Sequence, residues 1–129
     1  MSEAKTTIGA IAWTDLTVPN ADTVRDFYAA VVGWEPKGRD MGGYDDYEML
    51  SPQSGETQAG ICWARGANAD LPATWLVYIN VEDLDASVAK VTEAGGSIVQ
   101  EIKDIGEYGR FCVIKDPAGA VSCLYEPAS

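Results

Sequence analysis

The side chains that most often do chemistry in proteins are scarce in this sequence. It contains no histidine, so the commonest general base and the commonest ligand of transition metals are both missing. The three cysteines, Cys62, Cys112 and Cys123, are an odd number and show no metal-type spacing such as C-x-x-C. A nucleophilic cysteine would need a lowered pKa, and no histidine is present to lower it. The pattern favours buried, reduced and inert thiols, which are typical of a cytoplasmic protein.

Composition and charge narrow the range of partners. The 129 residues include 20 Asp and Glu against 9 Lys and Arg, a net charge of −11. Because phosphate binding needs a basic surface, we expect neither nucleic acid nor an anionic membrane as a partner. No stretch approaches the roughly 18 apolar residues of a membrane span, and the N-terminus lacks the apolar core of a secretory signal. We expect a single cytoplasmic domain over residues 1–129, whose acidity either serves solubility or suits a cationic small molecule.

The helices and strands expected from the sequence occur twice, in the same order, along the chain. A shift of 63 residues brings Val18 onto Val81, Asp22 onto Asp85 and Gly33 onto Gly96. At the same shift the chain repeats an apolar strand, a capping residue, an amphipathic helix and three short strands. The expected strands are 8–18, 34–38, 44–50, 58–64, 75–81, 97–103, 108–115 and 120–126; the expected helices end at Gly33 and Gly95-Gly96, with Asn20 and Asp83 as N-caps. The sequence therefore predicts an α+β fold of two βαβββ modules, about 7–65 and 73–127.

Short motifs follow one another in a recognisable order over about 8–126. They are Trp13-Thr14-Asp15-Leu16, Asp26-Phe27-Tyr28, Gly33-Trp34, Trp75-Leu76-Val77-Tyr78, Ala94-Gly95-Gly96, Gly109-Arg110-Phe111 and Asp116-Pro117-Ala118-Gly119. In this order the chain resembles the vicinal oxygen chelate superfamily, which includes glyoxalase I, bleomycin-resistance proteins and extradiol dioxygenases. The resemblance implies that the modules form a cup-shaped mixed sheet with the helices on its outer face. It also implies a homodimer.

The resemblance further implies four metal-ligand positions, one on the first and last strand of each module. They fall on Trp13, Gly60, Leu76 and Cys123, and the 63-residue shift relates Trp13 to Leu76 and Gly60 to Cys123. Chelating members of the family carry His, Glu or Gln there, whereas only Cys123 offers a ligand here. One soft ligand cannot assemble a zinc, nickel or iron site. We therefore expect no metal and no cofactor, and neither metal-dependent glyoxalase nor ring-cleaving dioxygenase activity.

Side chains two residues from these positions would share the concave face of the sheet and line a pocket for a small organic molecule. The candidate ligand-binding residues are Trp13, Asp15, Cys62, Leu76, Tyr78, Asn80, Arg110, Cys123 and Tyr125. Asp15 is either a cation anchor, a general base or an exposed carboxylate. Arg110 pairs either with a ligand carboxylate or with an acidic residue of the chain. The sequence does not decide whether Arg110 and Tyr47 face inward.

The acidic run 40–48, with its interleaved tyrosines, forms either a loop over the pocket or a solvated hairpin.

Three functions fit the sequence. The chain is a metal-independent binding protein that sequesters an antibiotic or metabolite, or a metal-free isomerase, lyase or hydroxylase-like tailoring enzyme that uses Asp15 or a tyrosine. The third is a non-catalytic accessory protein whose cup is filled by Trp13 and Leu76. The first is the leading interpretation, because the ligand positions are lost while aromatic pocket residues remain.

Overall fold

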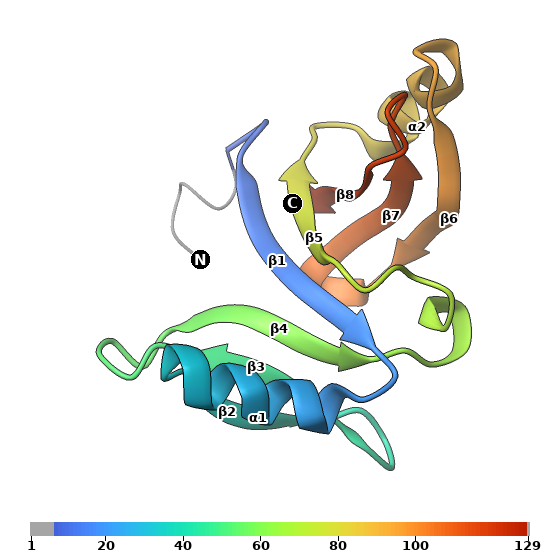
Figure 1. Cartoon of the computed structure of the whole chain (residues 1–129). Coiled ribbons are helices and arrows are strands. Elements are labelled where there is room, and N and C mark those ends of the chain that lie inside the picture. Colours follow the sequence, from blue (N-terminus) through green and yellow to red (C-terminus); the bar gives the residue numbers. More distant parts are fainter. Residues whose placement is uncertain (1–6, 129) are drawn as a thin grey trace. The chain divides into compact units, whose positions relative to one another are not determined.

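The computed structural model describes residues 7–128, which form eight strands, two α-helices and two short 3-10 helices (Figure 1). The elements are β1 (Ile11–Val18), α1 (Ala21–Val32), β2 (Glu35–Asp40), β3 (Asp45–Leu50), β4 (Thr57–Trp63), the 3-10 helix Gly66–Asn68, β5 (Trp75–Asn80), α2 (Leu84–Glu93), β6 (Ser97–Asp104), the 3-10 helix Gly106–Tyr108, β7 (Gly109–Lys115) and β8 (Val121–Pro127). This order confirms the predicted α+β class and the two βαβββ successions. None of the helices in this part of the chain has the length and apolar character needed to cross a membrane.

The described residues divide into two compact units. The first unit comprises residues 14–75, and the second comprises residues 76–128 together with residues 7–13. Residues 7–13 belong to the second unit, where hydrogen bonds tie them to the end of β5. Gly9 N–H donates to the Asn80 carbonyl at 2.8 Å, and Asn80 N–H donates to the Ala10 carbonyl at 2.9 Å.

The first unit is a mixed sheet of four strands in the order β2-β3-β4-β1, with α1 against one face (Figure 1). β1 pairs with β4 in parallel, and the other neighbours are antiparallel. Apolar residues of α1 recur at helical spacing and pack on the sheet, because this spacing places them along one side of a helix. The buried core of this unit consists of Leu16, Val18, Ala21, Met49 and Ile61. The helix ends at Gly33, whose φ of 86° is the left-handed conformation that glycine favours.

The second unit repeats this plan in the order β5-β8-β7-β6, with β5 and β8 parallel. Its core places Leu84 of α2 against Cys112 and Leu124. The predicted N-cap Asp83 is confirmed, since its side chain accepts a hydrogen bond from Ala86 N–H. The predicted N-cap at Asn20 is wrong in one respect: Asn20 stands at the cap position of α1 but makes no side-chain capping bond.

Strand pairing confirms the 63-residue repeat. In the parallel pair of the first unit, Asp15 lies opposite Gly60. In the second unit, Tyr78 lies opposite Cys123. Since 15 + 63 = 78 and 60 + 63 = 123, the two registers are related by the same shift that relates the sequences. The two units are therefore built alike, down to the residue pairs that face each other.

Candidate functional site

Each unit has one sheet face that its helix does not cover, which we call the helix-free face. In β1, Leu16 and Val18 pack in the core under α1. Side chains alternate along a strand, so Asp15 and Thr17 point to the helix-free face of the first unit. The parallel register brings their partners in β4 to the same face, where Asp15 faces Gly60 and Thr17 faces Cys62. Asp15 and Cys62, two of the candidate ligand-binding residues, thus lie on neighbouring strands of the same face. Trp13 lies in the part of β1 that belongs to the second unit.

The helix-free face of the first unit is polar. Gly60 lies opposite Asp15 on one side and opposite Glu48 of β3 on the other. Neighbouring strands are about 4.8 Å apart, so the two carboxylate-bearing residues are roughly 10 Å apart at Cα, with only a glycine between them. The Thr57 hydroxyl donates to Glu48 Oε1 at 3.2 Å and orients that carboxylate. This pair of carboxylates across a glycine can hold a polar ligand or exchange protons with it.

The Cys62 thiol lies among charged groups on this face. Burial raises its pKa well above the usual range for a thiol, and the carboxylates of Asp15 and Asp46 raise it further, with Arg39 opposing them. Asp46 also lies directly opposite Arg39 in the β2–β3 pair. A thiol held in its neutral form is a poor nucleophile, which supports the expectation of an inert cysteine.

Sequence reasoning missed Glu48, Asp46 and Arg39 as members of this face. The alternation of Asp46 and Glu48 along the acidic run was the available signal, because period-two polar residues mark one face of a strand. The register that sets Glu48 beside Gly60 was not available, since residues far apart in the sequence determine it. The run itself is the β2–β3 hairpin rather than an unstructured loop.

The helix-free face of the second unit is aromatic. The β5–β8 register pairs Tyr78 with Cys123 and Asn80 with Tyr125. Phe111 of β7 lies opposite Tyr125, and its ring centroid is 5.9 Å from that of Tyr78. The Tyr125 hydroxyl donates to the Tyr108 carbonyl, and burial raises the pKa of Tyr125.

The candidate residues of the second unit differ in how deeply they are buried. Leu76 and Cys123 are fully buried and Asn80 is 1% exposed, while Tyr78 and Tyr125 are half-buried. The half-buried rings are the groups on this face with surface available for stacking on a planar ligand. Phe111 belongs to the same group and was not predicted, because only the β7–β8 register places it there.

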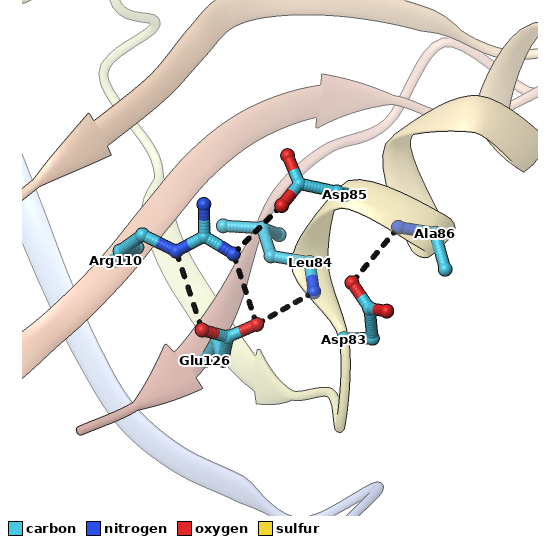
Figure 2. Close-up of polar contacts among 6 residues, drawn as sticks. All are labelled: Asp83, Leu84, Asp85, Ala86, Arg110 and Glu126. Atoms are coloured by element: carbon cyan, nitrogen blue, oxygen red, sulfur yellow. Dashed lines mark hydrogen bonds and ion pairs between the residues drawn. The ribbon is translucent and has the colours of Figure 1, made fainter. Parts of the chain in front are cut away.

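Arg110 makes its contacts on the opposite side of the sheet. Its guanidinium binds Glu126 through two hydrogen bonds of 3.2 and 3.0 Å and Asp85 of α2 through one of 3.1 Å (Figure 2). Glu126 Oε1 also accepts the Leu84 N–H at the start of α2, at 2.9 Å. The pKa of Glu126 is lowered, first by the Arg110 hydrogen bond and then by that of Leu84. The sequence left open whether Arg110 pairs with a ligand carboxylate or with an acidic residue of the chain. In the structure it pairs with Glu126 and Asp85.

Tyr47, the counterpart of Arg110 in the repeat, is also on the helix side. It packs against the core of the first unit, and the guanidinium of Arg25 from α1 lies 4.6 Å from its ring centroid. Arg110 and Tyr47 therefore both stand apart from the helix-free faces. A ligand on a helix-free face could reach Arg110 only after its three ionic hydrogen bonds were broken.

The metal-ligand positions implied by the family do not fit a metal. Trp13, Gly60 and Leu76 carry no donor atom that a transition metal prefers, and Cys123 alone cannot complete a coordination shell. Within residues 7–128, no group of three or more His, Cys, Asp or Glu side chains could hold a metal ion. We therefore derive no chemistry through a metal.

Comparison with known proteins establishes the family. The profile of the Glyoxalase/Bleomycin resistance protein/Dioxygenase superfamily matches residues 10–124, so the chain belongs to this superfamily. It is 34% identical to "Putative glyoxylase CFP32" of Mycobacterium tuberculosis over 93% of its own length and 45% of the relative's. It is 31% identical to "Anthracycline biosynthesis protein DnrV" of Streptomyces peucetius, over 91% of this chain and 46% of that protein. The chain thus spans about half the length of the curated relatives it matches.

Solved structures confirm the fold. Methylmalonyl-CoA epimerase from Mycobacterium tuberculosis is similar with a TM-score of 0.53 and 19% identity, over 100% of this chain and 93% of the epimerase. The Mn(II)-bound glyoxalase from Novosphingobium aromaticivorans has a TM-score of 0.55 and 18% identity, over 88% of this chain and 37% of that one. These identities are low, so the structures support the architecture and not a shared reaction.

Proposed function

We propose that this chain binds a small, planar organic molecule without a metal, on the helix-free face of its second unit. The observation that carries the proposal is the replacement of metal donors at Trp13, Gly60 and Leu76, together with the half-buried aromatic rings of the second unit. An aromatic face with a few fixed polar groups is the usual lining of a site for such molecules.

The relatives favour a polycyclic aromatic ligand. The anthracycline biosynthesis protein DnrV is 31% identical to this chain over a region that covers 91% of the chain and 46% of that protein. Tyr78 and Phe111 of the second unit offer ring faces on which such a ligand can stack. Sequestration of such a compound, an antibiotic or a metabolite, is the function that these features support best.

The test is equilibrium binding of doxorubicin, an anthracycline whose own fluorescence reports binding, to metal-stripped protein. We expect saturable binding that Tyr78→Leu weakens roughly 3- to 10-fold, because it removes a stacking ring while retaining apolar volume. Tyr108→Leu is the matched control, since Tyr108 is an exposed ring and its backbone carbonyl, to which Tyr125 donates, is retained. Absence of saturable binding, or an equal loss in both variants, would count against the proposal.

A metal-free enzyme is the second candidate, favoured by the two carboxylates on either side of Gly60. One carboxylate could take a proton from a substrate while the other returns it. Asp15→Asn would then abolish turnover even at concentrations of the compound that saturate the variant. Turnover that persists in Asp15→Asn would remove this residue from any mechanism.

We also propose that the chain acts as a cytoplasmic homodimer. Three cysteines that form no disulfide within residues 7–128 support a reducing compartment, and the exposed apolar side chains of Phe27 and Val31 on α1 support an interface. Light scattering on the purified chain should return twice the monomer mass of 13.8 kDa. A concentration-independent monomer would contradict the dimer.

A further inference from the structure

A depression lies at the end of the β2–β3 hairpin, on the helix side of the first unit. It has a volume of about 530 Å³ and is lined by Asp40, Gly43, Tyr44, Asp45, Tyr47 and Trp63. We propose that these residues, which we call the aromatic depression, bind a small organic cation of the alkylammonium or guanidinium class. The site is separate from the proposed ligand site, because Tyr47 and Trp63 pack on the core of the first unit under α1, whereas the ligand is proposed to bind the second unit.

Two rings of the aromatic depression already make cation–π contacts with arginines of the chain. The guanidinium of Arg65 lies 3.8 Å from the ring centroid of Tyr44, and that of Arg25 lies 4.6 Å from the centroid of Tyr47. Both distances are well inside the roughly 6 Å at which a cation is attracted to an aromatic face. Two of the three rings are thus oriented so that a positive group can stack on them.

The third ring is held in a fixed position. The Trp63 indole N–H donates to the Asp45 carbonyl at 2.9 Å, and the Trp63 backbone N–H donates to Asp46 Oδ1 at 3.0 Å. Indole is the side chain whose face attracts cations most strongly. Because both N–H groups of Trp63 are engaged, the ring is ordered before a ligand binds, and binding costs little further conformational entropy at this side chain.

The charge of the lining selects the sign of the ligand. Asp40 and Asp45 lie directly opposite each other at the end of the hairpin, and the guanidiniums of Arg65 and Arg25 already occupy the Tyr44 and Tyr47 ring faces, where a ligand cation would take their place. Like charges opposite each other across two strands are destabilising, so a cation bound between them would relieve repulsion. Glycine at position 38 makes room for this arrangement, since a Cβ there would stand 2.6 Å from Asp45 Oδ2.

The second unit shows that the fold does not require this lining. A depression of about 410 Å³ stands at the related place, and its residues Gly106, Arg110 and Glu126 correspond to Gly43, Tyr47 and Trp63 under the 63-residue shift. There an ion pair between Arg110 and Glu126 occupies the positions of the two rings. The aromatic residues are therefore particular to the first unit, as expected of a site with its own ligand.

The test titrates the isotope-labelled full chain with choline and with its uncharged isostere 3,3-dimethyl-1-butanol. The resonance of the Trp63 indole N–H reports occupancy, because that group lies in the lining. We expect choline to shift it saturably and the isostere to leave it nearly unchanged. Tyr44→Leu and Asp45→Asn should each weaken choline binding roughly 3- to 30-fold. Arg65→Gln should tighten it, because the competing guanidinium is removed from the Tyr44 ring.

Tyr108→Leu is the matched control, since this exposed tyrosine lies in the second unit and outside the aromatic depression. It should bind choline as the unmodified chain does, and so should Tyr78→Leu, which separates this site from the proposed ligand site. Equal shifts with choline and the isostere would overturn the inference. So would choline binding that Tyr44→Leu leaves unchanged or that Arg65→Gln fails to tighten.

Discussion

The N-termini of α1 and α2 offer a matched pair of substitutions, because Asn20 and Asp83 are related by the 63-residue shift. Asp83 Oδ1 accepts the Ala86 N–H at 3.1 Å, whereas Asn20 makes no side-chain bond to its helix. Removing an N-cap acceptor costs about 1 kcal/mol of stability. We therefore expect Asp83→Ala to lower the free energy of unfolding by about that amount and Asn20→Ala to change it by less than about 0.3 kcal/mol.

The substitution Asp83→Ala removes a single capping hydrogen bond from α2. The neighbouring Leu84 N–H is bound by Glu126 Oε1, a contact that Asp83→Ala leaves in place (Figure 2). At about 2.1 cal/mol/K per residue, unfolding 129 residues carries an entropy of about 0.27 kcal/mol/K. A loss of about 1 kcal/mol then corresponds to a fall in Tm of about 4 °C.

Thermal denaturation followed by circular dichroism measures both variants, and urea denaturation at 25 °C provides an independent free energy. The reasoning predicts a fall in Tm for Asp83→Ala and almost none for Asn20→Ala. Equal falls in Tm for the two variants would show that the hydrogen bond from Ala86 N–H to Asp83 adds nothing to the stability of the protein. A larger fall for Asn20→Ala would refute the assignment of caps.

Three further predictions concern stability and reactivity. The pKa of Glu126 is lowered in the fold, so the ionised carboxylate stabilises the protein above its ordinary pKa of 4.5, and this stabilisation is lost as the pH falls through the folded pKa. In Glu126→Gln the free energy of unfolding, measured by urea titration, should therefore fall less between pH 6 and pH 3 than in the unmodified chain. Because the pKa of the Cys62 thiol is raised, iodoacetamide at pH 8 should modify Cys62 far more slowly than a free cysteine, as peptide mapping measures; fast modification would contradict its burial. Leu84 is fully buried, so Leu84→Ala should lower the unfolding free energy by about 2–5 kcal/mol, and a loss below 1 kcal/mol would show that the site collapses around the cavity.

Local patterns were enough to predict the succession of elements. Helical spacing of apolar residues gave α1 from Ala21, and Gly33 marked its end. Alternation along β1 correctly put Asp15 on the opposite face from Leu16. The internal repeat then extended each assignment to the other half, because two similar sequences fold into similar units.

Contacts between distant residues could not be read from the sequence. Arg110 had several acidic residues within reach, and only the β7–β8 register selects Glu126, 16 positions away. Glu48 joins the helix-free face for the same reason, since the β3–β4 register decides its neighbour. The missing bond at Asn20 depends on backbone angles of −120° and 51° at that residue, which residue type alone does not determine.

The central claim is that an organic ligand binds without a metal, and thermal denaturation of the metal-stripped chain tests it most directly. A ligand at about 100 times its dissociation constant adds roughly 2.7 kcal/mol, a rise in Tm of about 10 °C for a chain of this size. The account predicts such a rise with doxorubicin, the same rise in the presence of a chelator, and none with zinc, nickel, manganese or iron alone. Stabilisation by one of these metals at about one ion per chain, with no effect of the organic compound, would contradict it.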